Sequence, residues 1–322
     1  MSITFYRWLA VAAGFAITMT GALQGQTYTY STFNVPDAAP ATAGSLGVNG
    51  INKAGDVVGY LTDTLGNVKG WLRGAKGGIK LLVDPLDTTT PSYTLAYGIN
   101  GYGAVTGIYY NTAGEYFPGF LYSSTKDKFE TFTLAGEPTG TAVYLEGINN
   151  VAGDYCGSVG APPNYVYQAF VSLAGVNTIF AVEGSTDSIC TALNDSGAAV
   201  GVYVDAGGVD HGWYRNPKTG TVTVINVPGA STVPAALACW GTVAGTVLNG
   251  INNSGEISGH FFDTSGLSHG FVLTGGKFIH LDVPGAAQTG GGGINALGQV
   301  AGHYSDSSCN NSGFIATPSS SS

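Results

Sequence analysis

Short runs of alternating apolar and polar residues recur along the chain, separated by Asn, Asp and Gly turns, which is the pattern of β-strands joined by hairpins. In the clearest example, residues 251–283, the Asn252 side chain can form a hydrogen bond with the backbone two residues further along the chain. Gly255 can take the left-handed conformation of a bulged hairpin. The pattern predicts a four-stranded antiparallel meander, with strands ending at Ile251 and spanning 256–262, 269–273 and 278–283.

This block occurs six times, and an Asn marks the same turn in each copy. The intervals between these Asn residues are 48, 49, 45, 58 and 43 residues, a period that fits one propeller blade. No long window has the spacing of an amphipathic helix. The predicted fold is all-β, a six-bladed β-propeller of four-stranded antiparallel blades. The marker segments are Gly50-Ile51-Asn52, Gly98-Ile99-Asn100, Gly147-Ile148-Asn149, Ala192-Leu193-Asn194, Gly250-Ile251-Asn252 and Gly293-Ile294-Asn295.

The two ends of the repeat region complement each other. The sixth copy stops after its third strand, at 313–316, whereas the segment Tyr28–Val35 matches the fourth strand of other copies, such as 222–227. We therefore expect Tyr28–Val35 to complete the last blade. Closing the ring in this way removes two exposed sheet edges.

The recurring blocks resemble the HAF-type bacterial extracellular repeat. They are G-I-N-x-x-G, the D-x-x-G-x-x-H-G-F of Asp263–Phe271 and the D-V-P-G-A of Asp282–Ala286, and the resemblance covers nearly the whole chain after the N-terminal segment. The third copy departs most, with 161–164 in place of the Asp/Gly turn and Ala169 where Gly is usual. The resemblance implies export and a repeat fold, and it brings no assigned activity or catalytic residue.

Residues 1–25 have the three parts of a secretory signal peptide: Arg7, an apolar run over 8–17, and small or polar residues to Gly25. The small residues before the cleavage site are compatible with cleavage after Ala22 or after Gly25. We take residues 26–318 as a single six-repeat propeller domain, followed by a serine tail at 319–322. No later segment is apolar for long enough to span a bilayer. We expect a secreted or periplasmic monomer.

The chain carries a net charge of −9, and 10% of its residues are charged, so nucleic acid and anionic lipid are poor partners. An even number of cysteines in an exported chain favours two disulfides among three possible connectivities, with free buried thiols as the alternative. We favour Cys156 with Cys190, from adjacent copies, and Cys239 with Cys309, which the repeat places on one rim of the propeller.

Most residues that could take part in catalysis or metal binding recur at fixed positions of the repeat. The Asp turns beginning at Asp63, Asp205, Asp263 and Asp306 carry one carboxylate each, which favours hairpins capped by Asp over calcium loops. The matched histidines His211 and His269, and likewise His260 and His303, are expected to lie a blade width apart. His280 is expected alone on an outer strand.

No paired carboxylates outside the turns, nucleophile elbow or phosphate loop leading into a helix is present. We therefore predict no catalytic residue, no metal site and no cofactor.

The long interval before Asn252 is the main departure from periodicity, and its extra residues include Cys239 and Trp240. Links between blades lie on the same rim as the turns between second and third strands, where propellers place ligand sites. Trp240 is therefore a candidate ligand contact. The alternative is an aromatic side chain packed inside a loop pinned by a disulfide.

The sequence favours a non-enzymatic binding module, with an extracellular carbohydrate, cell-envelope component or protein as its partner, because aromatic side chains can stack on sugar rings. An extracellular glycan-acting enzyme is the first alternative, and it would need at least two convergent carboxylates on the rim. A structural or adhesive protein is the second.

Overall fold

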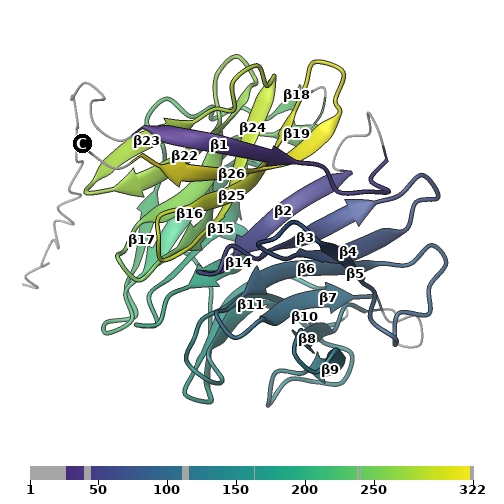
Figure 1. The fold of residues 1–322 in the computed structure, drawn as a ribbon. Helices are drawn as coiled ribbons and strands as arrows, with labels where there is room; N and C mark the ends of the chain where they lie inside the picture. Colours follow the sequence, from purple (N-terminus) through teal and green to yellow (C-terminus); the bar gives the residue numbers. More distant parts are fainter. Residues whose placement is uncertain are drawn as a thin grey trace, which may run out of the picture.

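The computed structural model describes residues 27–39, 45–110, 116–162, 164–237, 239 and 241–319. These residues form strands and turns without a helix, and their main sheets are six antiparallel four-stranded units that follow one another in chain order (Figure 1). A single parallel bridge between Asp210 and Gly245 joins the fourth and fifth units. The six-bladed β-propeller expected from the repeat is confirmed.

The first three blades each run in chain order from an inner to an outer strand. Their strands are β2 (Leu46–Ile51), β3 (Val57–Thr62), β4 (Val68–Arg73) and β5 (Ile79–Leu82); β6 (Thr94–Ile99), β7 (Ala104–Tyr109), β8 (Gly119–Ser123) and β9 (Lys128–Phe132); and β10 (Ala142–Ile148), β11 (Tyr155–Gly160), β12 (Gln168–Leu173) and β13 (Val176–Phe180).

Blades 4 to 6 follow the same order, except that the last outer strand comes from the start of the chain. Their strands are β14 (Ser185–Leu193), β15 (Ala199–Asp205), β16 (Asp210–Arg215) and β17 (Val222–Ile225); β20 (Gly245–Ile251), β21 (Ile257–Phe262), β22 (Ser268–Thr274) and β23 (Lys277–Leu281); and β24 (Gln288–Ile294), β25 (Val300–Ser305), β26 (Asn311–Pro318) and β1 (Tyr28–Phe33). The long link before blade 5 forms a small hairpin of β18 (Ala235–Leu237) and β19 (Gly241–Val243).

The N-terminal strand closes the ring as expected. β1 pairs antiparallel with β26 from Tyr28 opposite Pro318 to Phe33 opposite Gly313, and it lies beside the C-terminal strands in Figure 1. The strand ends at Phe33, two residues earlier than predicted, although Val35 is still buried in the core. None of the described residues forms a helix with the length and apolarity needed to cross a membrane.

A closed circle of hydrogen bonds explains the Asn of the repeat. In each blade the side-chain amide of this Asn donates to the main-chain carbonyl of its counterpart in the next blade, and its Oδ1 accepts backbone N–H groups of its own turn. The donor–acceptor distances are Asn52 to Asn100 3.2 Å, Asn100 to Asn149 3.1 Å, Asn149 to Asn194 2.9 Å, Asn194 to Asn252 3.1 Å, Asn252 to Asn295 3.0 Å and Asn295 to Asn52 3.0 Å.

Close packing between neighbouring strands of one blade explains the aromatic residue of the third strand. In each blade a fully buried Trp or Phe lies opposite a Gly of the second strand, so its ring occupies the space above that Gly. The pairs are Trp71 with Gly59, Phe120 with Gly107, Phe170 with Gly157, Trp213 with Gly201, Phe271 with Gly259 and Phe314 with Gly302.

The glycine of the Gly-Ile-Asn segment is required because the inner strands converge at the axis. A Cβ atom on Gly98 would lie 2.4 Å from the carbonyl oxygen of Glu146 in the next blade, and one on Gly50 would lie 2.7 Å from that of Tyr97. Both obstacles are backbone atoms of a paired strand, so they cannot rotate away.

Gly98→Ala is therefore expected to lower the free energy of unfolding by about 1–3 kcal/mol, the usual range for overpacking. The matched control is Gly78→Ala, because a Cβ on Gly78 has no neighbour within 4 Å. Urea denaturation of both variants provides the comparison. An equally small change in the two would show that the inner strands can separate without cost.

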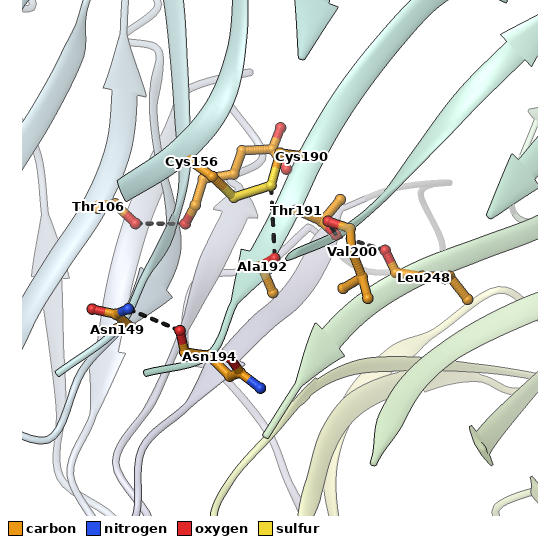
Figure 2. Close-up of a disulfide and its surroundings, with 10 residues drawn as sticks. Thr106, Asn149, Cys156, Cys190, Thr191, Ala192, Asn194, Val200 and Leu248 are labelled. Carbon is orange, nitrogen blue, oxygen red and sulfur yellow. Dashed lines mark hydrogen bonds between the residues drawn. A yellow bond between two sulfur atoms is a disulfide. The ribbon is translucent and has the colours of Figure 1, made fainter. Parts of the chain in front are cut away.

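Two disulfides link different blades. Cys156 of β11 bonds to Cys190 of β14, with a Cα–Cα distance of 5.6 Å, and Figure 2 shows this bridge between the third and fourth blades. Cys239, beside the β18–β19 hairpin, bonds to Cys309 in the β25–β26 turn, with a Cα–Cα distance of 5.2 Å. These are the two pairs that the sequence favoured.

Candidate functional site

Trp240, the ligand contact proposed from sequence, lies outside the described residues. Its neighbour Cys239 is buried and is held to Cys309. The long link is thus tied to the β25–β26 turn of the last blade, on the rim where links and second turns meet. The role of the Trp240 side chain stays a prediction.

A pocket of about 440 Å³ lies on this same rim, between the β5–β6 link and the β7–β8 turn. Its lining combines hydroxyl groups with aromatic rings, and Tyr93 remains 37% exposed at its edge. No sequence motif marked this pocket. The lining residues are Thr88, Thr89, Thr90, Pro91, Tyr93, Tyr110 and Phe117.

Aromatic rings continue from the pocket into the third blade. Phe117 contacts Tyr93 and Tyr110 at ring-centroid distances of 5.4 and 5.0 Å, and it contacts Tyr144 of β10 at 5.8 Å. Tyr144 in turn contacts Tyr167, just before β12, at 5.0 Å. The pocket is therefore the outer end of an aromatic series that reaches an inner strand.

Asp87 holds the β5–β6 link in place. This buried carboxylate accepts hydrogen bonds from the Tyr93 N–H at 2.6 Å, the Thr94 hydroxyl at 2.9 Å and the Thr89 N–H at 3.2 Å. The Asn67 side chain accepts a further bond from the Ser92 N–H at 3.0 Å. The pocket wall is consequently fixed before any ligand arrives, which limits the entropy lost on binding.

The axis of the propeller forms a second polar region. Every inner strand has a break in its register shortly before the repeat Asn, and such bulges re-aim side chains. At the end formed by the Asn turns, a cavity of about 100 Å³ is lined by residues of all six blades. The bulge residues three positions before the Asn are Asn49, Tyr97, Glu146, Thr191, Asn249 and Gly292.

Burial perturbs the titratable groups at this level of the axis. It raises the pKa of Glu146 to about 8, and burial with the nearby Glu146 charge raises the pKa of the Tyr97 hydroxyl well above its usual value. In the fifth and sixth blades, burial lowers the pKa of His260 to about 4 and that of His303 to about 3.

The two histidines of the second strands interact electrostatically. Burial is the main cause of the low pKa of His303 and His260 contributes to it, whereas the separation of the two imidazoles by a blade width stays a prediction. Both follow the Gly of a second strand, opposite Val247 and Gly290 of the inner strands, where the ring is narrow. His280 is exposed on the outer strand β23, as expected, and its ring lies 6.0 Å from that of His269 in β22.

The Asp turns are hairpin caps. In each turn one carboxylate oxygen accepts two backbone N–H groups, as Asp263 does from Ser265 and Leu267 at 2.8 Å. The other oxygen pairs with the third-strand residue at 2.8 Å for Asp63 with Lys69, and 3.1 Å for Asp205 with His211. Within the described ranges, no three His, Cys, Asp or Glu side chains are grouped to hold a metal ion.

Comparison with known proteins supports the architecture. No family model and no curated protein sequence matches the chain. Among solved structures it resembles AofleA from Arthrobotrys oligospora, with a TM-score of 0.51, 10% identity, and coverage of 87% of this chain and 84% of that one. It also resembles a fungal lectin, that of Aleuria aurantia, reported with a six-bladed β-propeller fold and a fucose recognition mode.

The Aleuria aurantia lectin matches with a TM-score of 0.51 and 10% identity over 88% of this chain and 97% of the lectin. The chain is a six-bladed propeller. TolB from Acinetobacter baumannii matches with a TM-score of 0.50 and 11% identity over 82% of this chain, which spans 63% of TolB. Since a likeness at this level of identity shows the fold alone, the propeller's function depends on its own pocket and axis.

Proposed function

We propose that this chain is an exported, non-enzymatic carbohydrate-binding propeller that holds its ligand in the pocket lined by Tyr93, Tyr110 and Phe117. The observation that carries the proposal is the combination of aromatic rings with the hydroxyls of Thr88–Thr90 around one preformed cavity. Aromatic faces pack against the apolar faces of sugars, and a few placed polar groups fix the orientation of a ligand. The fungal lectin among its structural neighbours, reported with a fucose recognition mode, supports this proposal.

The titratable groups favour binding over hydrolysis. Glycoside hydrolysis generally uses two carboxyl groups on opposite sides of the scissile bond. Among the described residues, the pKa of Glu146 at the axis is raised to about 8 without a neighbouring carboxylate, whereas Asp84, beside Asp87 in the β5–β6 link, and Asp210, beside Asp205, also have raised pKa values. Asp84 and Asp87 are buried, and both oxygens of Asp87 accept hydrogen bonds from the link itself, so this pair serves the structure of the pocket wall.

Export is proposed from the N-terminal segment and the cysteines together. Residues 1–25 have the pattern of a signal peptide, and the two inter-blade disulfides suit an oxidising compartment. We infer that the mature monomer acts outside the cytoplasm. The resemblance to the HAF-type repeat is consistent with that location.

A glycan array with residues 26–322 tests the proposal, with each hit also incubated for turnover. We expect specific glycan binding without product. Tyr93→Ala and Phe117→Ala should weaken binding of a hit by about tenfold to hundredfold, the scale of a truncated aromatic contact of about 1–3 kcal/mol. Calorimetry measures the affinity, and thermal unfolding confirms that each variant is folded.

Tyr102→Ala is the matched control, because Tyr102 is 73% exposed and lies on the opposite rim, in an Asn turn. Its affinity should equal that of the unmodified protein. Trp240→Ala extends the test to the link held by Cys239: weaker binding with unchanged stability would add Trp240 to the site. Full affinity in folded Tyr93→Ala and Phe117→Ala proteins would remove the pocket from consideration.

A further inference from the structure

The aromatic series that begins at the rim pocket continues across two further blades. Phe117, in the β7–β8 turn, contacts Tyr144 near the start of β10, and Tyr144 contacts Tyr167, just before β12. The Tyr167 backbone N–H then donates to Oδ1 of Asp187 at 2.8 Å. Asp187 belongs to β14, the inner strand of the fourth blade. The series therefore runs from the pocket beside the second blade to the rim end of the fourth.

The rings of this series remain accessible from the surface. Tyr93 is 37% exposed, and Tyr110, Phe117, Tyr144 and Tyr167 are each partly exposed. The aromatic residue of every third strand, in contrast, is fully buried in the core of its blade. Rings that served only to fill the core would be covered in the same way. The series therefore offers aromatic surface to a ligand beyond the pocket itself.

The spacing of the rings suits a chain of sugars. The centroid distances are 5.4 Å from Tyr93 to Phe117, 5.8 Å from Phe117 to Tyr144, and 5.0 Å from Tyr144 to Tyr167. Each step is close to the length of one pyranose unit in a glycan. Because an aromatic ring packs against the apolar face of a sugar, successive units of a chain can each meet a new ring. A monosaccharide would use only the first of them.

Polar groups stand at both ends of the series. The hydroxyls of Thr88–Thr90 line the pocket at one end, and no charged side chain contributes to that lining. At the other end, the partly exposed carboxylate of Asp187 accepts the Tyr167 N–H. A carboxylate can accept about four hydrogen bonds, so Asp187 has capacity for sugar hydroxyls. A few such groups fix the orientation of a ligand that is held mainly by apolar contacts.

We propose that the rim pocket and the rings from Phe117 to Tyr167 form one extended site for an unbranched chain of neutral sugars. This inference rests on the proposed carbohydrate function and names its substrate class. The end sugar occupies the pocket at Tyr93, and the following units pass over Phe117 and Tyr144 to Tyr167 and Asp187. Acidic chains are disfavoured, because the pocket lining supplies no cation and the chain carries a net charge of −9.

Calorimetry with three neutral series tests the dependence on chain length. The probes are cello-, laminari- and N-acetylchito-oligosaccharides, each from the monosaccharide to the hexasaccharide. In at least one series, we expect the affinity to rise by about tenfold for each of the first added units, the scale of one aromatic contact. The rise should end at about the tetrasaccharide, where the last ring is reached. Oligogalacturonides of equal length should bind at least about tenfold more weakly. An affinity independent of length in all three series would overturn the proposal.

Substitutions at the two ends separate the pocket from its extension. Tyr167→Ala should lower the tetrasaccharide affinity by about tenfold and the monosaccharide affinity by less than about twofold, whereas Tyr93→Ala should weaken both. Asp187→Asn keeps an oxygen for the Tyr167 N–H and should weaken the tetrasaccharide by about threefold or more. Tyr102→Ala, on the opposite rim, is the control and should bind both normally. Thermal unfolding checks each variant, and Asp187→Asn decides the question if Tyr167→Ala does not fold.

The outcomes distinguish this inference from the proposed function. Monosaccharide binding that is lost in Tyr93→Ala, without any gain from added units, would support the proposed function and reject the extended site. A gain with length that disappears in Tyr167→Ala or Asp187→Asn would support both. A gain that survives in both of these variants would place the chain elsewhere on the rim and reject the extended site. An empty glycan array, with no binding of any oligosaccharide, would reject both.

Discussion

Deleting residues 28–36 is expected to make the protein aggregate or to lower its melting temperature by at least about 10 °C. The deletion removes the whole of β1, which pairs with β26 over six positions, and also the buried Val35. Tyr30 packs on Phe314 and Phe33 on Trp71, so two blade cores lose a ring contact. A loss of about 5 kcal/mol corresponds to such a shift in a domain of this size.

The exposed edge explains why aggregation is the expected accompaniment. Without β1, the strand β26 presents unpaired N–H and C=O groups that can pair with another chain. Phe33→Ala should reproduce part of the loss, and Thr29→Ala, at an exposed position of the same strand, should change little. Thermal unfolding and light scattering report both effects. A soluble deletion variant with an unshifted melting temperature would contradict closure by this strand.

The repeat made the architecture predictable because its motif residues meet the hydrogen-bonding and conformational requirements of the backbone. Asn252 caps its own turn and joins the ring of amide bonds, and Gly255 has a φ of 79°, as the bulged turn requires. Such requirements are the same in every blade, so they appear as a period in the sequence. The same regularity placed Cys239 and Cys309 on one rim, where they form a disulfide.

The candidate sites were harder to predict because they depend on the residues that vary between blades. The link containing Tyr93 has an ordinary length, and its aromatic partners Phe117 and Tyr144 belong to other segments, so no single stretch marked the pocket. Glu146 occupies a position taken by Asn49 or Thr191 elsewhere.

The histidine pair His260 and His303 illustrates the same limit. Their equal repeat positions predict a separation by a blade width, but the burial that lowers both pKa values could not be read from the repeat. The Asn249 side-chain amide donates a hydrogen bond to His260 Nδ1 at 3.0 Å, and the charge of His260 contributes to the lowered pKa of His303 in the next blade.

The buried histidines make the fold sensitive to acid. The unfolded chain takes up protons near pH 6.5, whereas the folded chain resists protonation until about pH 4 at His260 and about pH 3 at His303. Because the folded-state pKa values are lowered, the two histidines do not reduce the free energy of unfolding above pH 7. Their cost grows as pH falls below 6.5 and reaches about 3 kcal/mol for each histidine near pH 4.

His260→Gln and His303→Gln are therefore expected to reduce the loss of unfolding free energy between pH 7 and pH 4, each by about 3 kcal/mol. Glutamine keeps a hydrogen-bonding group but cannot take up a proton in this range. His280→Gln is the control, since His280 is exposed on an outer strand. Urea midpoints at pH 7, 6, 5 and 4 give the comparison for all three variants. If the histidine variants lost as much stability as the unmodified protein over this range, the acid sensitivity would have to arise from carboxylates, which act mainly below pH 4.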